Sequence, residues 1–221
     1  MTISRAERLA RSVLCFERQS LSSIHSWRQC YEYFGRPEGA FDHEEGTLRL
    51  AFYLASWGMF RGSSQLREFS FPVLSDVVAL LRRPANAPLR ALKIGGAVEK
   101  RVELTALLDG IIGGLVDKSL DNGTGGTVKI SVTDTLQTKI ALGGLGCLPA
   151  YDRFFKDGAK KRGWNCRFNG NGMMDLFQSA ISDAEFNDFC AIMRRDEGCH
   201  TLPEMRLLDA YLNHLGRMVA E

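Results

Sequence analysis

Signals for the start of an α-helix recur along this chain, and they constrain its fold more than any other feature. A hydroxyl residue followed three positions later by glutamate is typical of a helix N-terminus, because both side chains can accept hydrogen bonds from unpaired amides. Three such pairs are present: Ser4 with Glu7, Ser182 with Glu185, and Thr201 with Glu204. From Met205 to Leu215 apolar residues recur every three or four positions. The spacing predicts an amphipathic C-terminal helix.

Three further helices are predicted from their apolar residues. The apolar residues within 44–60 would lie on nearly all sides of a helix, which indicates a central helix buried on several sides. Residues 98–116 predict a helix that contains Gly110, Gly113 and Gly114, and these glycines favour close packing against a neighbour. Residues 71–81 predict a shorter helix, and Phe16 belongs to an apolar stripe of the first helix that is typical of core.

Little of the sequence predicts β-structure. Turn-forming residues cluster at 83–88 and 121–127, which we expect to be loops. Residues 128–132 alternate like a strand, and 89–94 offer a plausible partner, so at most a small two-stranded ribbon is expected. The predicted architecture is a mainly α helical domain over 1–221, with lobes 1–118 and 131–221 joined by a glycine-rich loop.

Composition excludes several classes of protein. With 221 residues, 45% of them hydrophobic, the chain can bury a sizeable core. A net charge of +2 excludes a globally basic binder and leaves room for a local positive patch. The six cysteines and four histidines show no zinc-ligand spacing, so free thiols are expected, with no metal and no cofactor.

The N-terminal residues carry charges and lack an apolar core followed by a small-residue cleavage site. No apolar run reaches the roughly 18 residues that a membrane-spanning helix needs. A cytoplasmic protein that does not enter a membrane is therefore expected.

A glycine-rich turn is the feature that most suggests a function. Gly144-Leu145-Gly146, followed by Ala150, is typical of a tight hairpin between two helices. Glycines let backbone amides approach a phosphate closely, and a small alanine lets two helices cross. The alternative is a glycine-rich connection between packed helices with no ligand.

This pattern resembles the helix-hairpin-helix DNA glycosylases over residues 131–155, about a tenth of the chain. That family is all-α and two-lobed, and a lysine or an activated water attacks the sugar of a flipped-out nucleotide while an aspartate stabilises positive charge. The resemblance implies that Asp152 stabilises this charge, that Lys139 is a nucleophile or phosphate contact, and that Tyr151 stacks on or orients a base. The alternative is a buried Lys139–Asp152 ion pair that holds two helices together.

Two positions depart from the family pattern. The nucleophilic lysine of its best-known members corresponds to Leu148, and the position of their aspartate is occupied by Arg167. The sequence therefore allows either a rearranged site built on Lys139 and Asp152, or a hairpin that binds nucleic acid without cutting it.

A basic run follows the hairpin. It contains five cations interleaved with Trp164: Lys156, Lys160, Lys161, Arg162 and Arg167. Such a run can continue a phosphate-binding surface, in which each contact adds salt-dependent affinity. A solvated basic loop is the alternative.

A second aromatic cluster lies at the end of the predicted central helix. Trp57 and Phe60 could hold a flat ligand between them, while Arg61, Ser63 and Ser64 bind an anionic or polar group. Alternatively Trp57 is a core anchor and Arg61 contacts carbonyl groups at the helix end.

Together these features predict a DNA-binding protein of glycosylase type that excises an unusual or modified base, from altered or foreign DNA, by cleaving the N-glycosidic bond. A non-catalytic nucleic-acid-binding module and a helical interaction protein are the alternatives. The number of subunits stays open.

Overall fold

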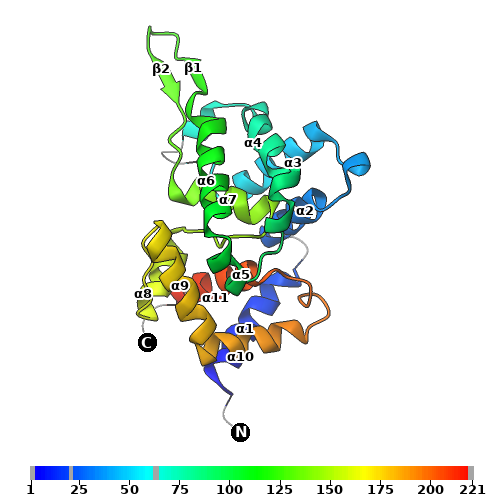
Figure 1. Ribbon diagram of the computed structural model, residues 1–221, viewed down its shortest axis with the longest axis vertical. Helices are drawn as coiled ribbons and strands as arrows, with labels where there is room; N and C mark the ends of the chain where they lie inside the picture. Colours follow the sequence, from blue (N-terminus) through cyan, green and yellow to red (C-terminus); the bar gives the residue numbers. More distant parts are fainter. Residues whose placement is uncertain (1–2, 20–21, 62–64, 219–221) are drawn as a thin grey trace.

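A computed structural model of the chain describes residues 3–19, 22–61 and 65–218. Within these ranges the fold is mainly α with one two-stranded antiparallel ribbon, which confirms the predicted class (Figure 1). The α-helices are α1 (Arg5–Glu17), α2 (Ile24–Phe34), α3 (His43–Ser56), α4 (Ser75–Leu81), α5 (Ile94–Glu99), α6 (Arg101–Val116), α7 (Asp134–Gly144), α8 (Arg153–Lys161), α9 (Gly170–Ser182), α10 (Ala184–Arg194) and α11 (Glu204–Arg217). The strands are β1 (Ser119–Asp121) and β2 (Thr127–Lys129), and short 3₁₀-helices lie at Glu38–Ala40, Gln65–Glu68, Phe71–Leu74 and Pro84–Leu89.

The predicted helix starts are confirmed in one case and corrected in two. Ser4 caps α1 by accepting a hydrogen bond from the Glu7 amide. At α10 the cap is Asp183, one residue after the predicted Ser182. At α11 the N-cap is Pro203, which has no side-chain acceptor, so the predicted Thr201 lies before the helix. The Glu204 carboxylate accepts a hydrogen bond from the backbone amide of Ile94.

The helices are arranged in two halves (Figure 1). One half contains α2, α3, α4, α6 and α7 with the ribbon, and the other contains α1 and α8 to α11, with α5 packed against α9. Helix α1 packs against α10 and α11, far from it in the sequence. The division at 1–118 and 131–221 stays a prediction, and in this packing α1 lies with the C-terminal helices.

Helix α7 occupies the centre of its half. It contacts α2, α3, α4 and α6, and every residue from Leu136 to Gly144 is buried. The prediction of a central helix at 44–60 is wrong, because α3 exposes 52% of Leu48 and 59% of Phe52. One face of α3 packs against its neighbours, and the other faces solvent.

The predicted helix at 98–116 is divided into α5 and α6 around Lys100. Two of its glycines are closely packed, as predicted: a Cβ atom on Gly110 would meet Leu80, and one on Gly114 would meet Val77, both in α4. Gly113 lies on the open side of α6, with no neighbouring atom within 4 Å of a Cβ position.

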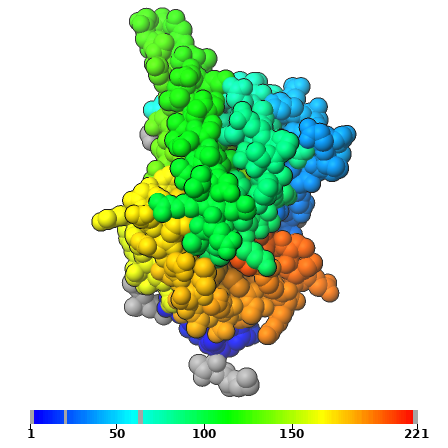
Figure 2. Space-filling model, viewed as in Figure 1, coloured from blue at the N-terminus to red at the C-terminus, as the bar shows by residue number. Residues whose placement is uncertain are grey.

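Strand β2 pairs with β1, so the predicted partner at 89–94 is wrong. Leu120 lies opposite Val128 in this antiparallel register, and the turn between the strands uses Gly123 and Gly125 at positive φ. A nearby strand joined by a short turn costs less chain entropy than a distant one. The ribbon stands out from the body of the molecule (Figures 1 and 2).

Helices α8 and α11 cross at very short range through two glycines. A Cβ atom on Gly158 would overlap the carbonyl oxygen of Leu212, and one on Gly216 would overlap the carbonyl oxygen of Phe154. Each glycine therefore lies against the backbone of the other helix. This crossing places the N-terminus of α8 beside the second half of α11.

We expect Gly158→Ala to destabilise the fold by about 3 kcal/mol, because its methyl group meets rigid backbone and the two helices must separate. Gly113→Ala is the matched control, and it should stabilise α6 by about 0.5–1 kcal/mol because a helical glycine in open space is replaced by a better helix former. Urea unfolding gives both free energies. Equal values for the two variants would contradict the close crossing.

Candidate active site in a cleft between the two halves

A cleft of about 320 Å³ lies where the two halves meet. Its walls come from α1, the start of α2, the end of α3, α7, the N-terminus of α8, and α11. Four residues selected from two separate segments of the sequence line it: Trp57 with Arg61, and Lys139 with Asp152. Ser63 and Ser64, selected with Trp57, lie outside the described residues.

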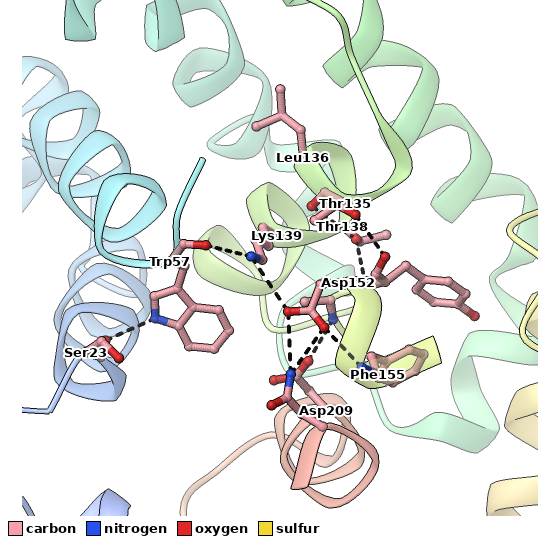
Figure 3. A network of polar contacts seen from close by, with 12 residues as sticks. Ser23, Trp57, Thr135, Leu136, Thr138, Lys139, Asp152, Phe155 and Asp209 are labelled. Atoms are coloured by element: carbon pink, nitrogen blue, oxygen red, sulfur yellow. Dashed lines mark hydrogen bonds and ion pairs between the residues drawn. The ribbon is translucent and has the colours of Figure 1, made fainter. Parts of the chain in front are cut away.

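The turn between α7 and α8 is held by side chains that bond its backbone (Figure 3). Thr138 Oγ1 accepts a hydrogen bond from the Tyr151 amide at 2.9 Å, and Thr135 Oγ1 donates one to the Tyr151 carbonyl at 3.0 Å. From α11, Asp209 Oδ1 accepts a hydrogen bond from the Ala150 amide at 3.1 Å. The position of Asp152, which directly follows Tyr151, is therefore fixed from both halves.

Asp152 is the N-cap of α8, and its carboxylate is surrounded by donors. It accepts a hydrogen bond from the Phe155 amide at 3.0 Å and one from Asn213 Nδ2 at 3.2 Å. Lys139 Nζ lies 3.8 Å from the other carboxylate oxygen. The helix N-terminus adds partial positive charge. With 18% of the side chain exposed, the carboxylate remains accessible from the cleft.

Lys139 links the end of α3 to the start of α8. Its Nζ donates a hydrogen bond to the carbonyl oxygen of Trp57 at 2.8 Å and faces Asp152 (Figure 3). Burial lowers the pKa of Lys139 below its ordinary value, and the carboxylates of Asp152 and Asp209 oppose this effect. The hydrogen bond to the Trp57 carbonyl and the ion pair with Asp152 fit a side chain that positions the Asp152 carboxylate.

A buried charge network forms the floor of the cleft. Arg206 of α11 donates to Asp209 at 3.0 Å and to Glu17 of α1 at 2.7 Å, and all three side chains are at most 4% exposed. Burial raises the pKa of the Asp209 carboxyl above its ordinary value, and the Arg206 guanidinium opposes this rise only in part. The pair between Arg206 and Glu17 links α11 to α1. Removing either side chain would leave an unpaired buried charge, which is strongly destabilising.

Aromatic side chains form the apolar part of the cleft. The Trp57 indole donates to the Ser23 carbonyl at 3.0 Å, and its ring packs edge-on against Tyr53. Phe16 also lines the cleft, and it is 50% exposed. The prediction that Phe16 belongs to the core is wrong. Helical spacing alone cannot tell a core position from one that faces a cleft.

Cations stand at the mouth of the cleft. Arg61 and Arg217 are both exposed and both line it. His214, one turn before the end of α11, lines it as well, and burial together with Arg217 lowers the pKa of its imidazole. Arg217, His214 and Asn213 were missed by sequence analysis, because only the fold brings α11 to Asp152.

The placement of Tyr151 in a ligand pocket is wrong. Its side chain is fully buried, with its ring 4.9 Å from that of Phe155 and 5.1 Å from that of Phe168 between centroids. Its hydroxyl has no hydrogen-bond partner among the described residues. The Tyr151 side chain does not line the cleft, and it contributes to the core of the half that contains α8 to α11.

The prediction that Gly144 and Gly146 offer amides to a phosphate is also wrong. Both glycines are buried. The Gly146 amide donates to the carbonyls of Ala141 and Leu142, and a Cβ atom on Gly144 would meet Leu81. These glycines serve close packing, which is the alternative that the sequence left open.

The basic run makes contacts within the protein rather than a free positive surface. Arg162 pairs with Asp183 and Glu185, and Trp164 lies against Tyr211. The remaining lysines contact acceptors as follows: Lys156 with Asp134, Lys160 with Asp157, and Lys161 with the carbonyls of Leu215 and Met218. The Lys160 side chain is 68% exposed, whereas that of Lys156 is 32% exposed. The predicted nucleic-acid surface at Lys156, Lys160, Lys161, Arg162 and Trp164 is therefore largely a set of structural contacts.

Comparison of the chain with family models, with curated proteins and with solved structures gave no match. Among the described residues no histidine, cysteine, aspartate and glutamate side chains group as a metal site, and the cysteines are free. No helix in the described part of the chain has both the length and the apolar character to cross a membrane.

Proposed function

We propose that this protein cleaves the N-glycosidic bond of a nucleotide in DNA and that the reacting sugar lies beside Asp152. The observation that carries the proposal is the convergence of Trp57, Arg61, Lys139 and Asp152 on one cleft. Cleavage of this bond develops positive charge on the sugar, and a fixed carboxylate beside the sugar stabilises that charge. An aromatic wall suits a flat base, and an arginine suits a phosphate.

The proposed reaction is a hydrolysis. The bond between sugar C1′ and the base nitrogen breaks, and its electron pair leaves with the base. Water adds to C1′, and the Asp152 carboxylate accepts the proton that this water releases. The departing base takes up a proton from solvent, and Asp152 then returns its proton to solvent. The reaction consumes one water, and nothing is oxidised or reduced. Asn213 and the Phe155 amide keep the carboxylate oriented while this occurs.

In this scheme Lys139 positions Asp152. Its Nζ donates a hydrogen bond to the Trp57 carbonyl and lies 3.8 Å from the Asp152 carboxylate, so both contacts hold it in place. A nucleophilic lysine must be neutral and free to reach C1′. The contacts of Lys139 therefore support a mechanism through water over one through a covalent adduct with the lysine.

Asp152→Asn should lower the rate of base release by at least about 100-fold and leave binding nearly unchanged, because the amide keeps the cap geometry but cannot accept a proton. Asp157→Asn changes a half-buried aspartate on the same helix that does not line the cleft, so it is the matched control and should retain full activity. Single-turnover release of bases from DNA strands that each carry one modified base measures the rate. Fluorescence anisotropy measures binding.

If Asp152→Asn releases a base as fast as the unchanged protein, the assignment of Asp152 is refuted. If neither protein releases a base while both bind DNA, the chain is a non-catalytic binding module.

Borohydride distinguishes the two routes to base release. A lysine that attacks C1′ forms an imine that borohydride reduces to a permanent protein–DNA adduct, whereas attack by water leaves none. We expect no trapped adduct under conditions in which the base is released. An adduct that Lys139→Met abolishes would show that Lys139 is the nucleophile.

A further inference from the structure

Two arginines that line the cleft have no carboxylate partner among the described residues. Inside the cleft Lys139 lies beside Asp152, and Arg206 is paired with Asp209 and Glu17. Glu17 also pairs with Arg28 at 3.4 Å, which gives three cations and three carboxylates. Arg61 and Arg217 at the mouth form no ion pair with any described residue. The interior charges are thus matched, and the excess positive charge is concentrated at the entrance.

Arg217 is oriented by its neighbours. Its Nε donates to Asn213 Oδ1 at 2.7 Å, and its guanidinium lies over the ring of Phe154, 4.1 Å from the centroid. Both terminal nitrogens are left without a hydrogen bond to a described residue. A guanidinium fixed on one edge and one face presents its remaining donors in a defined direction, which is the form that binds two oxygens of a phosphate.

A short chain of hydrogen bonds joins this arginine to the candidate catalytic carboxylate. Arg217 donates to Asn213 Oδ1, and Asn213 Nδ2 donates to Asp152 Oδ1. These two partners fix the orientation of the Asn213 amide, because Arg217 needs its oxygen as an acceptor and Asp152 needs its NH₂ group as a donor. A ligand that moves Arg217 therefore also changes the hydrogen bond that orients Asp152.

We propose that Arg61 and Arg217 bind the phosphate group of a nucleotide whose sugar and base enter the cleft. The inference rests on the proposed function and assigns the residues that hold the phosphate of its nucleotide, so a nucleoside without a phosphate should be a poor ligand. The buried hairpin and the internally paired basic run cannot supply this contact, whereas the entrance holds two cations beside Phe16 and Trp57. The phosphate is that of a DNA strand or of a free nucleotide.

The test measures binding in the Asp152→Asn background, where no substrate is consumed. The probes are a short single-stranded oligodeoxynucleotide of mixed sequence, the four deoxynucleoside 5′-monophosphates, and the four deoxynucleosides. Arg61→Ala and Arg217→Ala should each weaken binding of the phosphate-bearing probes on the order of 10-fold. Each should also reduce the salt slope for the oligonucleotide by about 0.7. Binding of the nucleosides should be weak and equal in all variants.

Lys160→Ala is the matched control, because it removes one exposed cation from α8 outside the cleft. It should change neither affinity nor salt slope. Arg217→Lys keeps the positive charge but loses the planar guanidinium that can donate to two phosphate oxygens. This variant should therefore bind the phosphate-bearing probes with intermediate affinity. Thermal unfolding of each variant checks that the fold is kept.

The outcomes separate the two proposals. Tight binding of the oligonucleotide but not the monophosphates identifies a DNA strand as the source of the phosphate. The reverse identifies a free nucleotide, which keeps the phosphate site and overturns DNA as the substrate. Arginine-dependent binding without any base release by the unchanged protein refutes the proposed function and keeps the phosphate site. Base release that depends on Asp152, with binding unaffected by either arginine, refutes the phosphate site alone. Absence of binding by every probe also overturns it.

Discussion

The close crossing of α8 and α11 is the contact on which the cleft depends. Gly158 and Gly216 let the two backbones touch, and no other residue type fits at either point. Helix α8 carries Asp152 at its N-terminus, and α11 carries the side chains that face it, so a wider crossing would separate Asp152 from Asn213. The same contact holds the turn after α7 in place through Asp209. Packing between α8 and α11 therefore determines how the side chains of the cleft are placed.

Local features of the fold could be predicted from sequence. Helical spacing and caps such as Ser4 report contacts within a few residues, so most helices lie where they were expected. The close packing of Gly110 was also foreseen, because a glycine inside an apolar helix needs a compensating neighbour. For the cleft, Trp57 was selected from an aromatic cluster at a helix end, and Lys139 and Asp152 were selected through the resemblance to the glycosylases.

Features that depend on distant partners could not be predicted. The glycines of the turn after α7 serve burial rather than a ligand, and the sequence around Gly146 is the same in either case. The pairing of Arg162 with Asp183 and the exposure of Phe16 follow from how α1, α8 and α10 meet. Arg217 lies far from Asp152 along the chain, and only the crossing of α8 and α11 brings the two together.

The most direct test uses the three tryptophans, whose indole N–H groups give separate signals in a ¹⁵N-labelled protein. Trp57 lines the cleft, Trp27 is buried with its indole bonded to the Leu142 carbonyl, and Trp164 lies in the basic run. Titration with the single-stranded oligonucleotide or the monophosphates should shift the Trp57 signal and leave those of Trp27 and Trp164 in place. A shift of Trp164 with Trp57 unchanged would contradict the cleft as the binding site.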